Sequence, residues 1–359
     1  MLIADTIKKL AQHRATHVAV LVVTCLVAAA VVIHPGSPES SAQAAPTVDL
    51  AKLKAQYVRP KLTPFPADDP YSKAKAHLGE LLFWDPIISG SGTQSCASCH
   101  NPALSWTDGL RLGMGVHEMK THTPTLLNVA WAPALGWDGR FHSLEVVAFA
   151  GPITNSGIMN RKPADLIHAL QAIPGYRAAF AAAFPDHAIT EAHIADALAT
   201  FERTIVSGTA PFDRWIAGDE HAISAQAKRG FVLFNGKAQC AECHTGWAFT
   251  DEGFYDVGTA TGTDIGRGRL FPTSVKLKYA FKVPTLRDVA RRAPYMHNGS
   301  DATLADVIDL YNRGGIDRPS RADFIKPLHL TAAEKSDLIA FLDTLTADPK
   351  PTDVPILPR

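Results

Sequence analysis

Apolar residues recur every three or four positions along several stretches of the chain, which is the spacing of a helix with one buried face. Two such stripes are Leu166, Ile167, Leu170 and Ile173 after Pro163, and Ile194, Leu198, Phe201 and Ile205. A third stripe, Leu338, Phe341, Leu342 and Leu345, follows a capping box formed by Thr331 and Glu334. Strand-like alternation is scarce. The pattern predicts an all-α protein, mainly helical with long loops that hold most of the 25 glycines and 25 prolines.

Four landmarks occur twice in the same order. The frame A-x-x-G-x-x-x-F spans 76–83 and 227–234, C-x-x-C-H spans 96–100 and 240–244, and P-T-L-x-x-V-A spans 124–130 and 284–290. Asp138-Gly139 near Leu144 is echoed by Asn298-Gly299 near Leu304. The repeat predicts two homologous modules, at 66–210 and 211–349, with an extended arm at 45–65 and a Pro-rich tail at 350–359.

The first 44 residues have the features of a leader. Lys8, Lys9 and Arg14 precede an uncharged run from Val18 to Ile33, and Ala42-Gln43-Ala44 follows as a cleavage motif. The run of 16 residues fits either a cleaved signal peptide or an uncleaved anchor in the inner membrane. Both alternatives predict an exported, periplasmic protein whose body keeps four of the five cysteines, because Cys25 lies inside the leader.

Bulk composition gives no sign of a nucleic-acid-binding protein. The 35 basic residues balance 35 acidic ones, so no nucleic-acid partner is expected, and 46% apolar content is typical of a soluble globular chain.

The four remaining cysteines form Cys96-Ala97-Ser98-Cys99-His100 and Cys240-Ala241-Glu242-Cys243-His244. In C-x-x-C-H, two thiols add to the vinyl groups of a c-type haem and the adjacent His ligates the iron. A dithiol redox pair needs no such His, and a zinc site needs four ligands per metal. The motifs therefore predict two covalent haem c groups with proximal ligands His100 and His244.

The distal ligands are less clearly marked. For the first haem, the candidates in the Gly-rich loop after the motif are Met114, His117, Met119 and His122. For the second haem they are Met296, His297 and Tyr311. Spacing alone does not choose among them.

Together with the haem motifs, Trp137-Asp138-Gly139-Arg140 and the run from Pro294 to Gly299 resemble the bacterial di-haem cytochrome c peroxidases and their MauG-type relatives over about residues 66–346. The resemblance implies two helical cytochrome c-like domains that face each other. It also implies that the first haem meets hydrogen peroxide, that the second relays oxidising equivalents, and that Trp137 lies between them.

Two departures favour the MauG-type branch. The peroxidases ligate the second haem with a Met 14 residues after the His of the P-Y-x-H motif, and here that position is Tyr311, as in the MauG type. An anionic oxygen ligand stabilises high-valent iron. Met114 stands where the peroxidases carry a switchable distal His, so the first haem is expected to be open to peroxide, with Met114 as a ligand left open.

The remaining departures concern proton transfer and calcium. Val147 and Ile158 stand where the family has a Gln and a Glu that help to cleave the O–O bond, which predicts slow turnover unless Glu145 or His142 carries the proton. Of these we assign Glu145 as the catalytic candidate. The family's calcium ion between the modules would meet His122 in place of an Asn, and the carbonyls of Arg292 and Pro294. Imidazole is a poor ligand for that cation, so a calcium ion between the domains would be held through carbonyls and waters.

The leading hypothesis is a periplasmic di-haem oxidoreductase that uses hydrogen peroxide to oxidise a redox partner, expected to be a protein, through high-valent haem iron and Trp137. The first alternative is a cytochrome c peroxidase that draws electrons from a small cytochrome. The second is a non-catalytic electron-transfer cytochrome.

Overall fold

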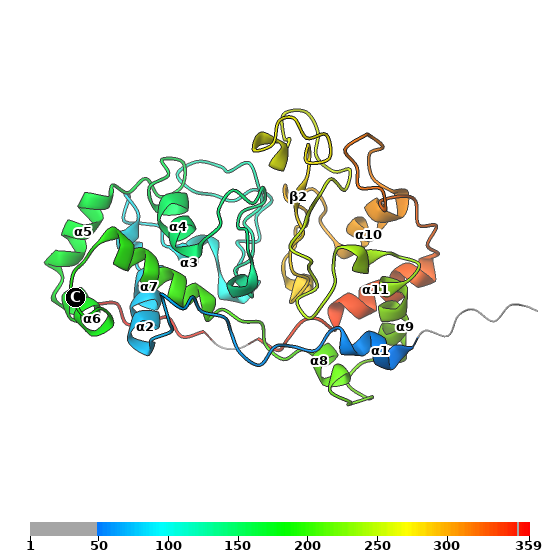
Figure 1. Ribbon diagram of the computed structural model, residues 1–359, viewed down its shortest axis with the longest axis horizontal. Helices are drawn as coiled ribbons and strands as arrows, with labels where there is room; N and C mark the ends of the chain where they lie inside the picture. The colour runs from blue at the N-terminus through cyan, green and yellow to red at the C-terminus, as the bar shows by residue number, and fades with distance from the viewer. Residues whose placement is uncertain (1–48, 350–351) are drawn as a thin grey trace, which may run out of the picture. The chain divides into compact units, whose positions relative to one another are not determined.

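The computed structural model describes residues 49–349 and 352–359, and it is mainly helical (Figure 1). The leader prediction for residues 1–44 lies outside these residues. The helices are α1 (Leu50–Ala55), α2 (Lys73–Trp84), α3 (Cys96–Cys99), α4 (Leu144–Ala148), α5 (Pro163–Ala172), α6 (Pro174–Ala183), α7 (Glu191–Arg203), α8 (Pro211–Ile216), α9 (Ala225–Asn235), α10 (Leu304–Arg313) and α11 (Ala332–Asp343). A two-stranded antiparallel ribbon pairs β1 (Phe254–Tyr255) with β2 (Phe281–Lys282). Among the described residues, no helix is long and apolar enough to cross a membrane.

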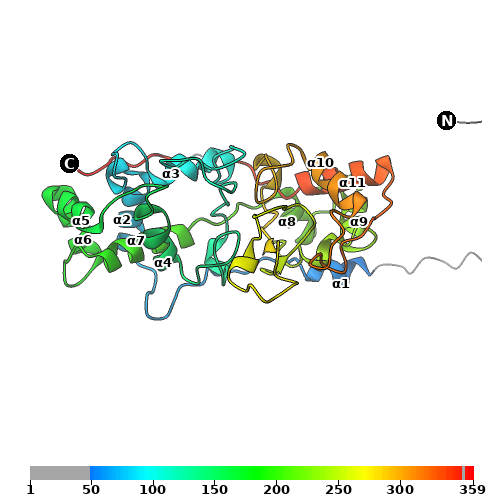
Figure 2. The same ribbon diagram turned by 90° about the horizontal axis from the view of Figure 1, so that it is seen from above.

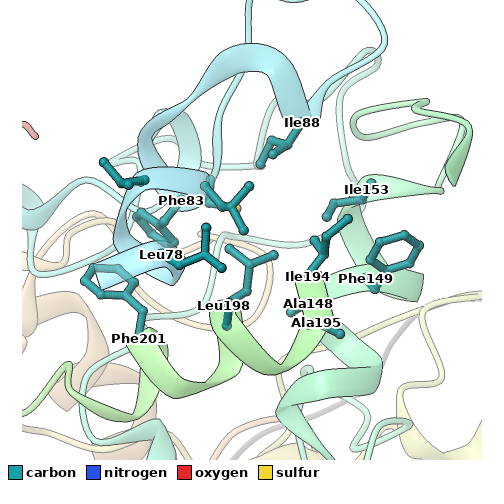
Figure 3. Packing of buried hydrophobic residues seen from close by; sticks show 14 of the residues in the cluster. Leu78, Phe83, Ile88, Ala148, Phe149, Ile153, Ile194, Ala195, Leu198 and Phe201 are labelled. Carbon is teal, nitrogen blue, oxygen red and sulfur yellow. The ribbon is translucent and has the colours of Figure 1, made fainter. Parts of the chain in front are cut away.

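The first hydrophobic core forms where α2 crosses α7. Leu78 and Phe83 of α2 pack with Leu198 and Phe201 of α7, as Figure 3 shows. Gly79 permits the crossing, because a Cβ atom there would lie 1.9 Å from the Ala197 carbonyl oxygen. The apolar stripes predicted for α5 and α7 are confirmed, and they face this core.

The second core repeats the arrangement where α9 crosses α11. A Cβ atom on Gly230 would lie 2.0 Å from the carbonyl oxygen of Asp337. Gly230 holds the same place in its sequence frame as Gly79. The predicted capping box begins α11, with the Thr331 hydroxyl accepting from the Glu334 amide and the Glu334 carboxylate accepting from the Thr331 amide. Each half of the chain thus builds its core on one helix pair that crosses at a glycine.

The sequence suggested an extended arm at 45–65, but this segment contains a helix. Asp49 caps helix α1, and Tyr57 after it is fully buried against Phe212 and Phe231 of the second core. Burying apolar side chains of this segment in the core is more favourable than exposing them to water in a solvated arm.

The Pro-rich tail has no regular secondary structure over residues 352–359. It ends beside α6, where the Gly175 amide donates to the Arg359 carbonyl at 3.3 Å (Figure 2). The C-terminal residues therefore contact the half of the chain that carries the first C-x-x-C-H motif.

Candidate active site

The two C-x-x-C-H motifs each form a tight turn that carries two free thiols. Cys96 and Cys99 bound α3, and Cys240 begins a 3-10 turn that leads to Cys243. Burial raises the pKa of the thiols of Cys240 and Cys243 to about 12. A redox dithiol needs a depressed thiol pKa instead, so these turns suit thioether attachment better than disulfide exchange.

Both histidines of the motifs are oriented by backbone carbonyls. His100 Nδ1 lies 3.1 Å from the Trp106 carbonyl oxygen, and His244 Nδ1 lies 2.9 Å from that of Phe249. Because a carbonyl only accepts, Nδ1 carries the proton and Nε2 keeps its lone pair. Burial lowers the pKa of both rings, which keeps them neutral. This donor set fits the proximal ligand of a haem iron.

Tyr311 lies on α10. Burial raises the pKa of its hydroxyl, and the negative fields of Cys243 and Cys240 raise it further, so the hydroxyl lies within the electrostatic reach of both thiols. A phenol oxygen is one of the side-chain ligands that haem iron accepts in proteins.

His297, an alternative distal candidate, is already engaged. Its Nε2 lies 2.7 Å from Asp264 Oδ2, and its ring stacks on Phe281 with centroids 3.6 Å apart. Of the three candidates for the second distal ligand, His297 is the one whose Nε2 is already held by a carboxylate.

Trp137 lies where residues of the two halves meet. Its Nε1 donates to the His122 carbonyl at 2.7 Å, and its own carbonyl accepts from the Lys282 amide at 2.8 Å. The His122 amide in turn donates to the His297 carbonyl at 2.8 Å, and the rings of Trp137 and His297 meet edge to face at 6.4 Å. These bonds fix the indole at the contact between the predicted modules.

Near the first motif, the acid–base candidates have unequal surroundings. Glu145 on α4 forms an ion pair with Arg203 of α7 at 2.6 Å. Burial alone would raise its pKa, but the hydrogen bond and charge of Arg203 outweigh it and the pKa falls. His142 is exposed. Val147 and Ile158 are partly buried and offer no proton carrier.

The loop around Met114 lies against the first motif. The Met114 carbonyl is 3.5 Å from Cys99 Sγ, and the side chain is 46% exposed. Met114 therefore contacts this motif through its backbone carbonyl and not through its thioether.

Sequence reasoning missed Glu202, a buried carboxyl group on α7. Burial raises its pKa to about 8, and its charge acts on Cys96. A clue was present, since Glu202 interrupts the apolar stripe of α7 one position after Phe201. A carboxyl on a core-facing stripe indicates a buried acid.

Three comparisons bear on this geometry. The family model described as "Di-haem cytochrome c peroxidase" matches residues 73–221. A methylamine utilization protein MauG of Methylorubrum extorquens is 47% identical over 94% of this chain and 96% of its own length. The chain belongs to the di-haem cytochrome c peroxidase and MauG family.

Other members of the family agree with this assignment. The cytochrome c551 peroxidase of Nitrosomonas europaea is 34% identical over 83% of this chain and 87% of its own length. A crystal structure of a MauG-like protein associated with microbial copper homeostasis superposes with a TM-score of 0.75 at 30% identity, covering 81% of this chain and 94% of that one.

Membership in the family decides between the classes of function. The protein is a haem peroxidase-type oxidoreductase with two haem c groups that uses peroxide and a redox partner. The non-catalytic cytochrome is set aside.

Proposed function

We propose that this enzyme is exported to the periplasm, free or tethered by its N-terminus, and uses hydrogen peroxide to oxidise a partner protein. The basic start of the chain and the uncharged run at 18–33 support export. The 47% identity to a protein named for methylamine utilization, MauG, favours the MauG type over the peroxidase alternative.

We assign one haem to Cys96, Cys99 and His100, and the other to Cys240, Cys243 and His244. The free thiols and the Nδ1-tethered imidazoles support this assignment. When bound, the haem groups supply reaction with peroxide and storage of oxidising equivalents. Tyr311 is proposed as the distal ligand of the second haem, since both thiols of that motif act electrostatically on its hydroxyl.

We further propose that the modules 66–210 and 211–349 arose by duplication. Their helix pairs cross at Gly79 and Gly230, which hold equivalent places in the sequence repeat.

The position of Trp137 is the observation that carries the proposal. An indole held at the contact between the modules is an oxidisable π-system. It divides one long electron-transfer path between the two haem sites into two shorter ones. Its Nε1 proton is tied to a backbone carbonyl at 2.7 Å, so the ring orientation is fixed and the indole keeps its hydrogen-bond partner. Trp137 is therefore the proposed relay between the two haem sites.

The alternative is a cytochrome c peroxidase that reduces peroxide with electrons from a small cytochrome. Relatives with that name support it, among them the peroxidase of Nitrosomonas europaea at 34% identity. Rapid steady-state oxidation of reduced cytochrome c would favour this alternative.

Replacing Trp137 tests the proposal. Trp137→Phe is expected to preserve the absorption spectra of both haems and to abolish oxidation of the partner protein, because the ring that bridges the modules is no longer readily oxidised. Trp131→Phe is the matched control, since Trp131 is also partly buried and packs edge to face on Trp247 across the two halves at 4.8 Å. Wild-type partner oxidation by Trp137→Phe would reduce Trp137 to a packing residue.

A further inference from the structure

Three large apolar side chains are exposed within a short segment of the second half. Leu270 is 44% exposed, Phe271 43% and Val275 59%. Single exposed apolar residues are common on protein surfaces, but an exposed group of neighbours marks a site of interaction. This segment is therefore a candidate docking surface.

Backbone contacts close the segment into a loop. The Arg267 amide donates to the Ala280 carbonyl at 2.9 Å. Gly268 lets the two sides of the loop approach each other, because a Cβ atom there would lie 2.9 Å from Lys278 Cα. We call residues 269–278 the apolar loop. Its exposed side chains are thus carried on a backbone that is tied together at both ends.

The apolar loop lies in a stretch rich in positive charge. Residues 264–282 contain five basic side chains and one acidic one, although the whole chain has 35 of each. The acidic one, Asp264, is engaged with His297 at 2.7 Å. The exposed basic residues of the loop are Arg269, Lys276 and Lys278. Lys276 pairs with Asp323 at 2.7 Å, but both side chains are exposed, and such a pair contributes little. The local field therefore favours a negatively charged partner.

The apolar loop is connected to the segment that carries Trp137. The Arg267 guanidinium lies 5.0 Å from the ring centroid of Phe271 and donates to the Asp138 carbonyl at 2.8 Å. The Lys282 amide, just beyond the loop, donates to the Trp137 carbonyl at 2.8 Å. One side chain, that of Arg267, thus connects the exposed Phe271 with the residue next to Trp137. A protein bound to the loop would lie near the proposed relay.

We propose that the apolar loop is the docking surface for an acidic redox protein. Leu270, Phe271 and Val275 supply the apolar centre of the contact, and the basic residues around them attract carboxylates of the partner. A second copy of this chain fits less well, because like charges would face each other if the loop met itself. The proposal rests on the partner protein of the proposed function, and it adds the charge of that partner and the place where it binds.

Binding of an acidic probe tests the charge of the partner. Plastocyanin, a small redox protein of negative net charge, is titrated into the holoenzyme in a calorimeter, and the basic mitochondrial cytochrome c is titrated for comparison. Plastocyanin should bind at low ionic strength and more weakly in added salt, because salt screens exposed charges. Mitochondrial cytochrome c should bind more weakly than plastocyanin.

Charge reversal places the contact on the loop. The double variant Arg269→Glu/Lys278→Glu should raise the Kd for plastocyanin about tenfold. The control is Lys162→Glu, which reverses an exposed charge in the first half and should leave the Kd unchanged. Failure of plastocyanin to bind, equal Kd values for the parent and the double variant, or tighter binding of mitochondrial cytochrome c would each overturn the proposal.

Replacing one apolar side chain tests the centre of the contact. Val275→Ser should weaken plastocyanin binding several-fold, and Val232→Ser, at a position 37% exposed on α9, should not. Unchanged binding by Val275→Ser would contradict an apolar centre. Sedimentation of the holoenzyme is expected to show a monomer, and a dimer that Val275→Ser dissociates would assign the loop to a second copy instead. Trp137→Phe should bind plastocyanin as the parent does, so failure of the relay and failure of docking are distinguishable.

Discussion

At the scale of single residues, Tyr311 gives the most direct prediction. Tyr311→Phe removes the phenol oxygen that we propose as the distal ligand, so the second haem should change from low spin to high spin or recruit another ligand. EPR and absorption spectra of the oxidised protein measure this. Tyr295→Phe is the control, since its hydroxyl only donates to the Val289 carbonyl at 3.2 Å. An unchanged low-spin spectrum would pass the role to Met296 or to His297, whose Nε2 contacts Asp264.

Glu145 is the second residue whose role can be measured. Its lowered pKa keeps it ionised, so it can accept a proton from peroxide but is a poor donor. Glu145→Gln is expected to slow the reaction of the first haem with peroxide by about 10²-fold. Stopped-flow absorption measures the rate, and Glu191→Gln, in the first turn of α7, is the control. A wild-type rate would restrict Glu145 to its ion pair with Arg203.

At the scale of secondary-structure elements, the crossing of α9 and α11 depends on Gly230. An Ala in an exposed helix stabilises by up to about 1 kcal/mol relative to Gly, but here the new Cβ would meet the Asp337 carbonyl at 2.0 Å. Gly230→Ala should therefore lower the free energy of unfolding by about 1–3 kcal/mol. Denaturant unfolding measures it, with Val232→Ala on the more exposed side of α9 as the control. A stabilised Gly230→Ala variant would show that the helices separate at little cost.

At the scale of the whole molecule, Glu202 makes stability depend on pH. Burial raises its pKa from 4.5 to about 8. In the unfolded chain the carboxyl ionises near its ordinary value, so from about pH 4.5 upward unfolding releases a proton and the free energy of unfolding falls until the pH passes about 8. Below the unfolded pKa both states are protonated and no such loss occurs.

Glu202→Gln removes this titration from the core. The variant should be more stable than the parent at pH 8 and equal to it at pH 4, as measured by unfolding at both values. Glu191→Gln should show no such difference. Equal stability of Glu202→Gln and the parent at pH 8 would mean that Glu202 is ionised in the folded protein.

The sequence by itself determined what depends on near neighbours in the chain. A C-x-x-C-H turn, a stripe such as that of α7 and the capping box of Thr331 and Glu334 are each complete within a few residues, so their spacing predicted them. The repeated glycine frame also located α2 and α9. The resemblance built on these motifs gave the family, which the comparisons confirmed.

Only the tertiary structure decided which distant groups meet. The packing of Tyr57 into the second core, the bond between His297 and Asp264, and the pairing of Glu145 with Arg203 join residues 33 to 192 positions apart. Burial of the ionisable groups Glu202 and Arg292 likewise depends on the helices and loops that cover them. The periodicity of apolar side chains shows which face of a helix is apolar. It does not show which segment covers that face or which charged groups that segment carries. Ionisation and partner choice at this site are therefore properties of the folded chain.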